Sequence, residues 1–106
     1  MADAWLLVRA VVRDPADCAL FDQWYRAEHL PDAVKAFAAK AGWRGWSETD
    51  PSVHCAHYRF ESLERLAEVT AGTAINELIA EFDRVWGNRV TRTREILTVA
   101  DHLEGN

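Results

Sequence analysis

The feature that most constrains the fold is the run Ala-Trp-Leu-Leu-Val-Arg-Ala-Val-Val at positions 4–12. Its length and apolar, β-branched content predict a strand. Successive side chains of a strand point to opposite faces of a sheet, and here both faces are apolar apart from Arg9. One face carries Ala4, Leu6, Val8, Ala10 and Val12, and the other carries Trp5, Leu7 and Val11. Both faces of such a strand need to be covered.

A helix is predicted after this strand, because Asp14 can cap its N-terminus and Pro15 fits its first turn. Proline lacks an N–H group and disfavours a helical conformation in the residue before it. We therefore expect the helix to break near residues 29–30 and to start again with Pro31 in a new first turn. Gly42 is expected to end this second helical piece.

The rest of the chain alternates strand and helix signals. Residues 43–49 and 53–60 are predicted to form an antiparallel hairpin, because an Asp-Pro-Ser turn lies between them. Ser62 caps a short helix, apolar residues at helical spacing indicate a longer helix over residues 75–86, and residues 90–100 form the last strand. This order is that of a ferredoxin-like βαββαβ unit in the α+β class, with a four-stranded antiparallel sheet.

In a single domain of this kind, spanning residues 1–106, the helices cover only one face of the sheet. Trp5, Leu7 and Val11 then form an exposed apolar patch, which is unusual for a monomer. Burying one such side chain is worth about 1.5–3 kcal/mol. We expect a two-fold homodimer that packs its open sheet faces together. The alternative is a monomer in which the tail, residues 101–106, folds across this face.

Composition narrows the partners and the compartment. A total of 12 Lys and Arg against 17 Asp and Glu gives a net charge of -5, which argues against nucleic acid as the main partner because phosphate binding needs a basic surface. No apolar stretch near the N-terminus is long enough to span a membrane, and the basic segment of a secretory signal is missing. We expect a cytoplasmic protein with no membrane partner, in which Cys18 and Cys55 are reduced thiols.

The densest group of chemically active side chains is Trp-Tyr-Arg-Ala-Glu-His-Leu-Pro at positions 24–31. On a helix, Tyr25 and His29 share one face, with Trp24 beside them. These rings can line a pocket for a planar aromatic ligand, in which His29 transfers a proton and Tyr25 donates a hydrogen bond. A helix C-terminus favours the protonated imidazole, which suits an acid better than a base. Alternatively, Trp24 packs in the core and His29 caps the last carbonyls.

The string Phe-Asp-Gln-Trp-Tyr-Arg-Ala-Glu-His-Leu-Pro at residues 21–31 resembles the F-D-x-W-Y-x-x-E-H-L-P signature of the EthD-like dimeric α+β barrel proteins. The resemblance implies a ferredoxin-like protomer that dimerises through its sheet. It also implies a pocket between sheet and helices, close to Trp24, Tyr25 and His29. Related barrels include cofactor-independent monooxygenases, decarboxylases or cyclases of aromatic polyketides and proteins linked to ether degradation. A shared fold therefore does not select the reaction.

Two further residues are candidates for the substrate pocket. Tyr58 and His54 share one face of the strand over residues 53–60, and this face is expected to meet the helices. The alternative for Tyr58 is a core tyrosine with a bonded hydroxyl. His57 lies on the opposite face from His54, and no Cys or His pair has the spacing of a zinc site. We therefore predict no metal, and no motif indicates another cofactor.

The only basic run is formed by Arg89, Arg92 and Arg94. Arg92 and Arg94 lie on one face of the last strand. A pocket for an acidic substrate is one interpretation of this pair. The interpretation that we favour is that the charges protect an exposed strand edge against mispairing.

Three functions remain open. The first is a small cofactor-independent enzyme that converts an aromatic or polyketide-like metabolite. Its site residues are His29 and Tyr25 for catalysis, and Trp24, Tyr58 and His54 for substrate binding. The second is an accessory protein that binds a small apolar ligand without converting it. The third is a structural homodimer with no enzymatic activity.

Overall fold

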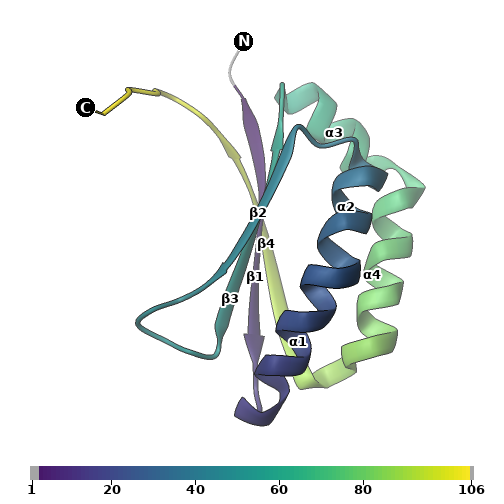
Figure 1. Cartoon of the computed structure of the whole chain (residues 1–106). Coiled ribbons are helices and arrows are strands. Elements are labelled where there is room, and N and C mark those ends of the chain that lie inside the picture. Colours follow the sequence, from purple (N-terminus) through teal and green to yellow (C-terminus); the bar gives the residue numbers. More distant parts are fainter. Residues whose placement is uncertain (1–2, 106) are drawn as a thin grey trace.

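Residues 3–105 are described by a computed structural model. Four strands form an antiparallel sheet with the order β2-β3-β1-β4. They are β1 (Ala4–Val12), β2 (Ala41–Trp46), β3 (Val53–Phe60) and β4 (Val90–Thr98). The helices gather on one side of this sheet (Figure 1). The predicted α+β class and the ferredoxin-like element order are therefore confirmed.

The helical layer has two parts. The first connects β1 to β2 through η1 (Pro15–Asp17), α1 (Cys18–Trp24), η2 (Tyr25–His29) and α2 (Leu30–Phe37). The second connects β3 to β4 through α3 (Leu63–Ala71), α4 (Thr73–Trp86) and η3 (Gly87–Arg89). The two predicted caps are present, because the side chains of Asp14 and Ser62 accept hydrogen bonds from backbone N–H groups of the turns that follow, at 3.0 and 3.1 Å.

The first helix does not break before Pro31, contrary to the expectation from the sequence. The segment Tyr25–His29 instead forms a π-helical turn, in which the N–H of Leu30 donates to the carbonyl of Tyr25, five residues back. The flanking residues Trp24 and Leu30 keep right-handed helical backbone angles, so the helix is continuous from α1 into α2. Pro31 lies in the first turn of α2. Because proline has no N–H, it donates no hydrogen bond back into the π-helical turn that precedes it.

Helix α2 ends earlier than the sequence suggested. Ala38 adopts left-handed backbone angles (φ 50°, ψ 41°) after the last helical residue, and β2 begins at Ala41. Gly42 therefore lies in the strand and does not end the helix. Its small size allows a close approach between layers, because a Cβ at this position would lie 2.6 Å from Cγ2 of Val34. Strands β2 and β4 also end two or three residues before their predicted ends.

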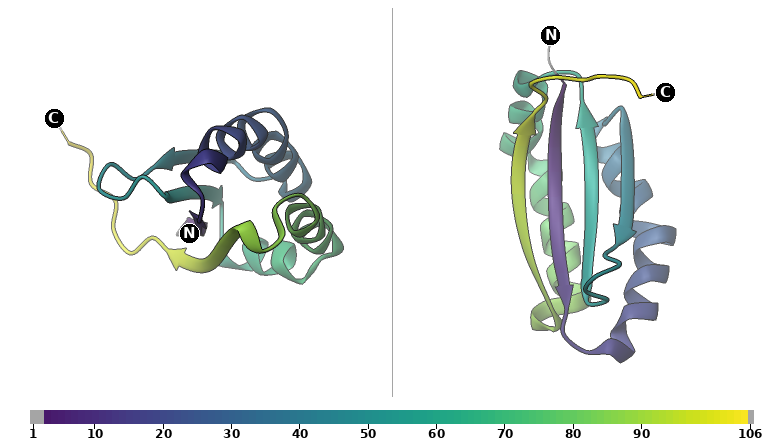
Figure 2. Two further views of the ribbon diagram at one scale, coloured as in Figure 1. Left: turned by 90° about the horizontal axis from the view of Figure 1, so that it is seen from below. Right: turned by 90° about the vertical axis from the view of Figure 1, so that its left-hand side faces the viewer.

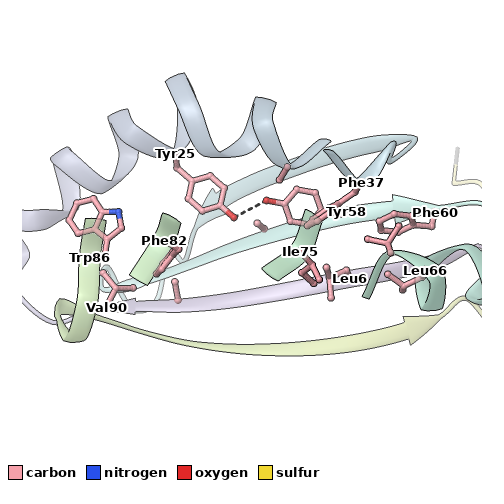
Figure 3. Close-up of a cluster of buried hydrophobic side chains, with 14 of the residues drawn as sticks. Leu6, Tyr25, Phe37, Tyr58, Phe60, Leu66, Ile75, Phe82, Trp86 and Val90 are labelled. Carbon is pink, nitrogen blue, oxygen red and sulfur yellow. Dashed lines mark hydrogen bonds between the residues drawn. The ribbon is translucent and has the colours of Figure 1, made fainter. Parts of the chain in front are cut away.

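The core lies between the helical layer and the face of the sheet that it covers, called here the inner face. Side chains from both layers interleave there (Figure 3). Tyr58 and His54 are buried on this inner face, as their strand parity predicted. The largest fully buried side chains are Tyr25, Tyr58, Phe21, Phe60, Phe82, Leu66, His54 and Val12.

The opposite, outer face of the sheet has no covering layer in the described chain (Figure 2). Trp5 stacks on Trp43 with ring centroids 4.9 Å apart, and His57 meets Trp5 edge-on at 5.9 Å. Trp43 and Leu97 remain 47% and 48% exposed. The tail over residues 101–105 is exposed throughout and runs past the end of the sheet (Figure 2). At that end, Asp101 and His102 line the same hollow as Trp5 and Trp43. The tail still leaves Trp43 and Leu97 about half exposed, so it does not bury the outer face as the monomer alternative requires; residue 106 lies outside the described chain.

Two further expectations concern membranes and thiols. Within residues 3–105, none of the helices combines the length and the apolar character needed to cross a bilayer. Cys18 and Cys55 are both free thiols, in agreement with the expectation that they form no disulfide.

Candidate active site

A small cavity, called here the inner cavity, lies between the helical layer and the inner face of the sheet. Its volume is about 30 Å³, which is room for little more than one water molecule. Apolar side chains from β1, α2 and α4 form most of its wall. The titratable groups that line it are those of Tyr25, His29, Tyr58, Arg92 and Arg94.

Two tyrosines face each other across the inner cavity. Tyr25 comes from the π-helical turn and Tyr58 from β3, and their hydroxyl oxygens are 2.9 Å apart (Figure 3). One hydroxyl donates to the other, so the hydrogen of the accepting hydroxyl has no partner within the described residues. Burial raises the pKa of Tyr58 to about 12 and the pKa of Tyr25 well above its usual range. The pair is therefore protonated at neutral pH and offers one free O–H donor.

His29 is held between aromatic rings. Its imidazole stacks on Trp24 at 4.7 Å and meets the edges of Tyr25 at 4.8 Å and Phe82 at 5.6 Å. Burial, with a smaller contribution from the charge of Arg92, lowers the pKa of His29 to about 4. The sequence suggested a protonated imidazole at a helix C-terminus. Because the helix continues, that terminus does not exist. His29 is neutral at pH 7, and its lowered pKa makes it a weaker base than an ordinary imidazole.

Two arginines from β4 reach the same cavity. Arg92 donates to Oδ1 of Asp83 at 2.9 Å, and its guanidinium lies 4.0 Å from the centroid of the Phe82 ring. The sequence favoured edge protection as the role of Arg92 and Arg94, whereas the structure places both on the inner face. The pairing of β4 with β1 explains this, because Arg94 lies opposite Val8 on the buried parity of β1. The four-stranded antiparallel sheet predicted from the sequence was the signal that could have placed the two arginines on this face.

The inner cavity adjoins a larger groove between α4 and β4. This α4–β4 groove has a volume of about 400 Å³ and shares Leu6, Ile75, Ile79 and Arg94 with the lining of the inner cavity. Its wall combines apolar side chains with the polar or charged side chains of Thr70, Asn76, Arg94 and Glu95. Glu95 is its one acidic lining residue within the described chain. The groove offers the space that the inner cavity lacks.

A polar network formed by His54, Arg44 and Asp22 begins next to the ring of Tyr25. The His54 ring lies 4.5 Å from the Tyr25 ring, and Nε2 of His54 lies 3.3 Å from Nη1 of Arg44. Arginine can only donate, so Nε2 is the acceptor and Nδ1 carries the proton, without a partner in the described chain. Arg44 and Trp46 both donate to Oδ1 of Asp22 at 2.8 Å. These bonds fasten α1 to the edge strand β2 and lower the pKa of Asp22.

The five residues selected from the sequence thus occupy different positions. Tyr25, His29 and Tyr58 line the inner cavity. Trp24 stacks on His29 without lining the cavity, and His54 packs behind Tyr25. The burial of His54 lowers its pKa to about 4, so it is neutral as well. The substrate-binding roles of Trp24 and His54 stay predictions. No group of three or more His, Cys, Asp or Glu side chains within residues 3–105 is placed to hold a metal ion.

Solved structures show which proteins share this architecture. SnoaB, a cofactor-independent oxygenase from Streptomyces nogalater, aligns with a TM-score of 0.68 at 11% identity, over 99% of this chain and 100% of its own. An ethyl tert-butyl ether (EthD) family protein from Bacillus halodurans aligns with a TM-score of 0.63 at 14% identity, over 86% and 96%. The chain has the fold of the dimeric α+β barrel proteins.

A dimeric ferredoxin-like protein from an uncultured marine organism also aligns, with a TM-score of 0.55 at 10% identity, over 97% of this chain and 100% of its own. The fold implied by the EthD-like motif is therefore confirmed. At such identities the likeness concerns the fold alone. No protein-family model matches the sequence, and no curated protein is significantly similar to it.

Proposed function

We propose that the protein is a cofactor-independent enzyme that removes a proton from carbon beside a carbonyl group in a small aromatic or polyketide-like metabolite. The observation that carries the proposal is that a neutral imidazole and a free phenol hydrogen line one largely apolar cavity. His29 accepts the proton, and the pair formed by Tyr25 and Tyr58 donates its free hydrogen to the carbonyl oxygen.

The proton acceptor and the hydrogen-bond donor both serve the same step, in which negative charge forms on the substrate. As the carbon–hydrogen bond breaks, negative charge develops on the carbonyl oxygen, and a fixed donor at that oxygen stabilises the resulting enolate. Such a hydrogen bond is stronger in a cavity with little water than in bulk solvent. A positioned histidine base contributes a factor of about 10²–10⁴ to the rate. Tyr25 and Tyr58 keep their protons at neutral pH, which leaves His29 as the base.

An enolate is a shared intermediate of several reactions that need no cofactor. It can react with molecular oxygen, close a ring, or exchange its proton. The likeness in fold to SnoaB, a cofactor-independent oxygenase, supports chemistry of this kind. The proposed step is therefore the proton abstraction that these reactions have in common.

The volumes indicate how a substrate would bind. The inner cavity of about 30 Å³ admits the reacting atoms but no ring. The α4–β4 groove of about 400 Å³ is large enough for a small ring system. We expect the carbonyl end to displace water between Tyr25, Tyr58 and His29, while the body of the substrate lies in the groove.

Deuterium exchange tests the proposed step directly. Small aromatic 1,3-diketones and anthrone are incubated in D₂O with the protein, and loss of the acidic C–H signal is followed by NMR. We expect the protein to accelerate exchange of at least one compound, and His29→Ala to lower this rate about 100-fold or more. His102→Ala, in the exposed tail, is the matched control and should retain the wild-type rate.

Three outcomes separate the candidate functions. Exchange that persists in His29→Ala removes His29 as the base. Compounds that quench tryptophan fluorescence without exchanging favour the accessory protein that binds but does not convert. A protein that neither binds nor exchanges any compound contradicts both and favours the structural homodimer.

We also infer that two protomers pack their outer sheet faces together. Support comes from the uncovered Trp5 and Trp43 stack, from the hollow of about 540 Å³ beside it, and from the fold shared with a dimeric ferredoxin-like protein. A second copy of the chain has the same outer face, so in a two-fold dimer each protomer can cover the outer face of the other. Sedimentation velocity at micromolar concentration should show a dimer, and a monomer would contradict the inference.

A further inference from the structure

The charges at the junction of the inner cavity and the α4–β4 groove are not balanced. Arg92 is engaged, because it bonds Asp83 and lies over the ring of Phe82. Arg94 lines both the cavity and the groove, yet it forms no ion pair or side-chain hydrogen bond within residues 3–105. Glu95 follows it in the strand and also lines the groove, but strand parity directs Glu95 toward the outer face, opposite Leu7, and away from Arg94.

We propose that Arg94 binds a carboxylate on the substrate, so that the pocket selects small apolar acids over neutral molecules. The inference rests on the proposed function and adds its substrate class. A guanidinium fork matches a carboxylate and can bind both of its oxygens. One part of the groove wall, formed by Ile75, Ile79 and Ile96, is apolar and fits a hydrocarbon body.

A bound carboxylate also removes an obstacle to the proposed proton transfer. Positive charge near His29 disfavours its protonated form, and Arg92 contributes to this effect. Arg94 lines the same cavity as His29. A substrate carboxylate held there brings a negative charge to the cavity wall, and nearby negative charge favours a protonated imidazole, so it makes His29 a stronger base. A neutral substrate provides no such change.

Binding measurements test the inference without any turnover assay. The probes are 1-naphthoate and its neutral analogue 1-naphthamide, titrated into the full-length protein by isothermal calorimetry. We expect 1-naphthoate to bind at least tenfold more tightly, and Arg94→Gln to abolish this preference. Arg94→Lys should keep part of it, because the charge remains and the fork is lost. Arg13→Gln, at an exposed position, is the matched control and should keep the full preference.

The remaining outcomes overturn the inference. Equal affinity for the two probes, a preference that survives Arg94→Gln, or no binding of 1-naphthoate at millimolar concentration would each contradict it. Inorganic phosphate that displaces 1-naphthoate with equal affinity would indicate a general anion site instead. If only the inference about Arg94 is wrong, the wild type still accelerates deuterium exchange. If the proposed function is wrong, the wild type does not accelerate exchange, even if it binds 1-naphthoate.

Discussion

The two faces of the sheet carry aromatic side chains in different environments. On the inner face, Tyr25 and Tyr58 are fully buried and bonded to each other, and the remaining space is about 30 Å³. On the outer face, Trp5 and Trp43 stack in the open beside a hollow of about 540 Å³. The inner face is covered by helices of the same chain, and it borders the cavity lined by Tyr25, His29 and Tyr58. The outer face is incomplete, which is the property of a surface that binds another protein.

The largest effect is expected from a substitution that disrupts the proposed dimer interface on the outer face. Trp5→Glu places a charge at the centre of the proposed interface, twice in a two-fold dimer, and should weaken dimerisation by roughly 3 kcal/mol or more, about 100-fold in dissociation constant. Leu20→Glu, at a position that is 57% exposed on α1, is the control and should leave assembly unchanged. Sedimentation velocity measures both, and a Trp5→Glu dimer as stable as the wild type would show that the outer face is not the interface.

Acid should lower the free energy of unfolding of the protein through two histidines on the inner side of the sheet. The pKa values of His29 and His54 are lowered from 6.5 to about 4 in the folded state, so between these values the unfolded chain binds more protons. The free energy of unfolding is therefore full above pH 6.5 and falls as the pH decreases, by about 2 kcal/mol per histidine at pH 5. Urea titrations at pH 7 and pH 5 measure the loss, and His29→Gln should reduce it. An equal loss in wild type and variant would contradict the buried, neutral His29.

The tyrosine pair should behave as one unit. Tyr58→Phe leaves the buried hydroxyl of Tyr25 without a partner and is expected to cost about 1–3 kcal/mol of unfolding free energy. The double variant with Tyr25→Phe removes both polar groups, so its cost should be smaller than the sum of the single costs. Urea denaturation of the four proteins gives the coupling, and strictly additive values would argue against a shared hydrogen bond.

The smallest effects compare two glycines of the same strand. A Cβ at Gly42 would press against Val34 at 2.6 Å, whereas a Cβ at Gly45 meets nothing within 4 Å. Gly42→Ala should cost about 1–3 kcal/mol, and Gly45→Ala should stay within about 0.5 kcal/mol. Both are measured in the Trp5→Glu background, where no partner covers the outer face. Equal losses at the two positions would contradict the difference in packing.

The sequence was sufficient for the features that follow from local pattern. Side-chain alternation in residues 4–12 predicted an inner and an outer face, and residues 21–31 predicted where Tyr25 and His29 lie. The protonation of His29 could not be obtained in this way. It depends on burial between Trp24 and Phe82, which come from separate helices.

The position of Arg94 does not follow from the local pattern of β4 alone, because it requires the pairing of β4 with β1, which comes from the strand order, as well as the parity of β4. The size of the inner cavity depends on side chains from six elements packed together. Properties of this kind are set by tertiary contacts between distant segments, so no local pattern in the sequence carries them.

The π-helical turn explains a repeat in the sequence that a regular helix would not tolerate. Phe21, Tyr25, His29, Ala33 and Phe37 recur at every fourth position, and four of them are buried. In an α-helix of 3.6 residues per turn, each such step rotates the side chain by about 40° around the axis. The wider turn at residues 25–29 rotates less per residue and offsets part of that drift. A π-helical turn holds one more residue than an α-helical turn, so deleting one residue there is expected to restore a regular helix while α1 and α2 keep their present faces toward the sheet.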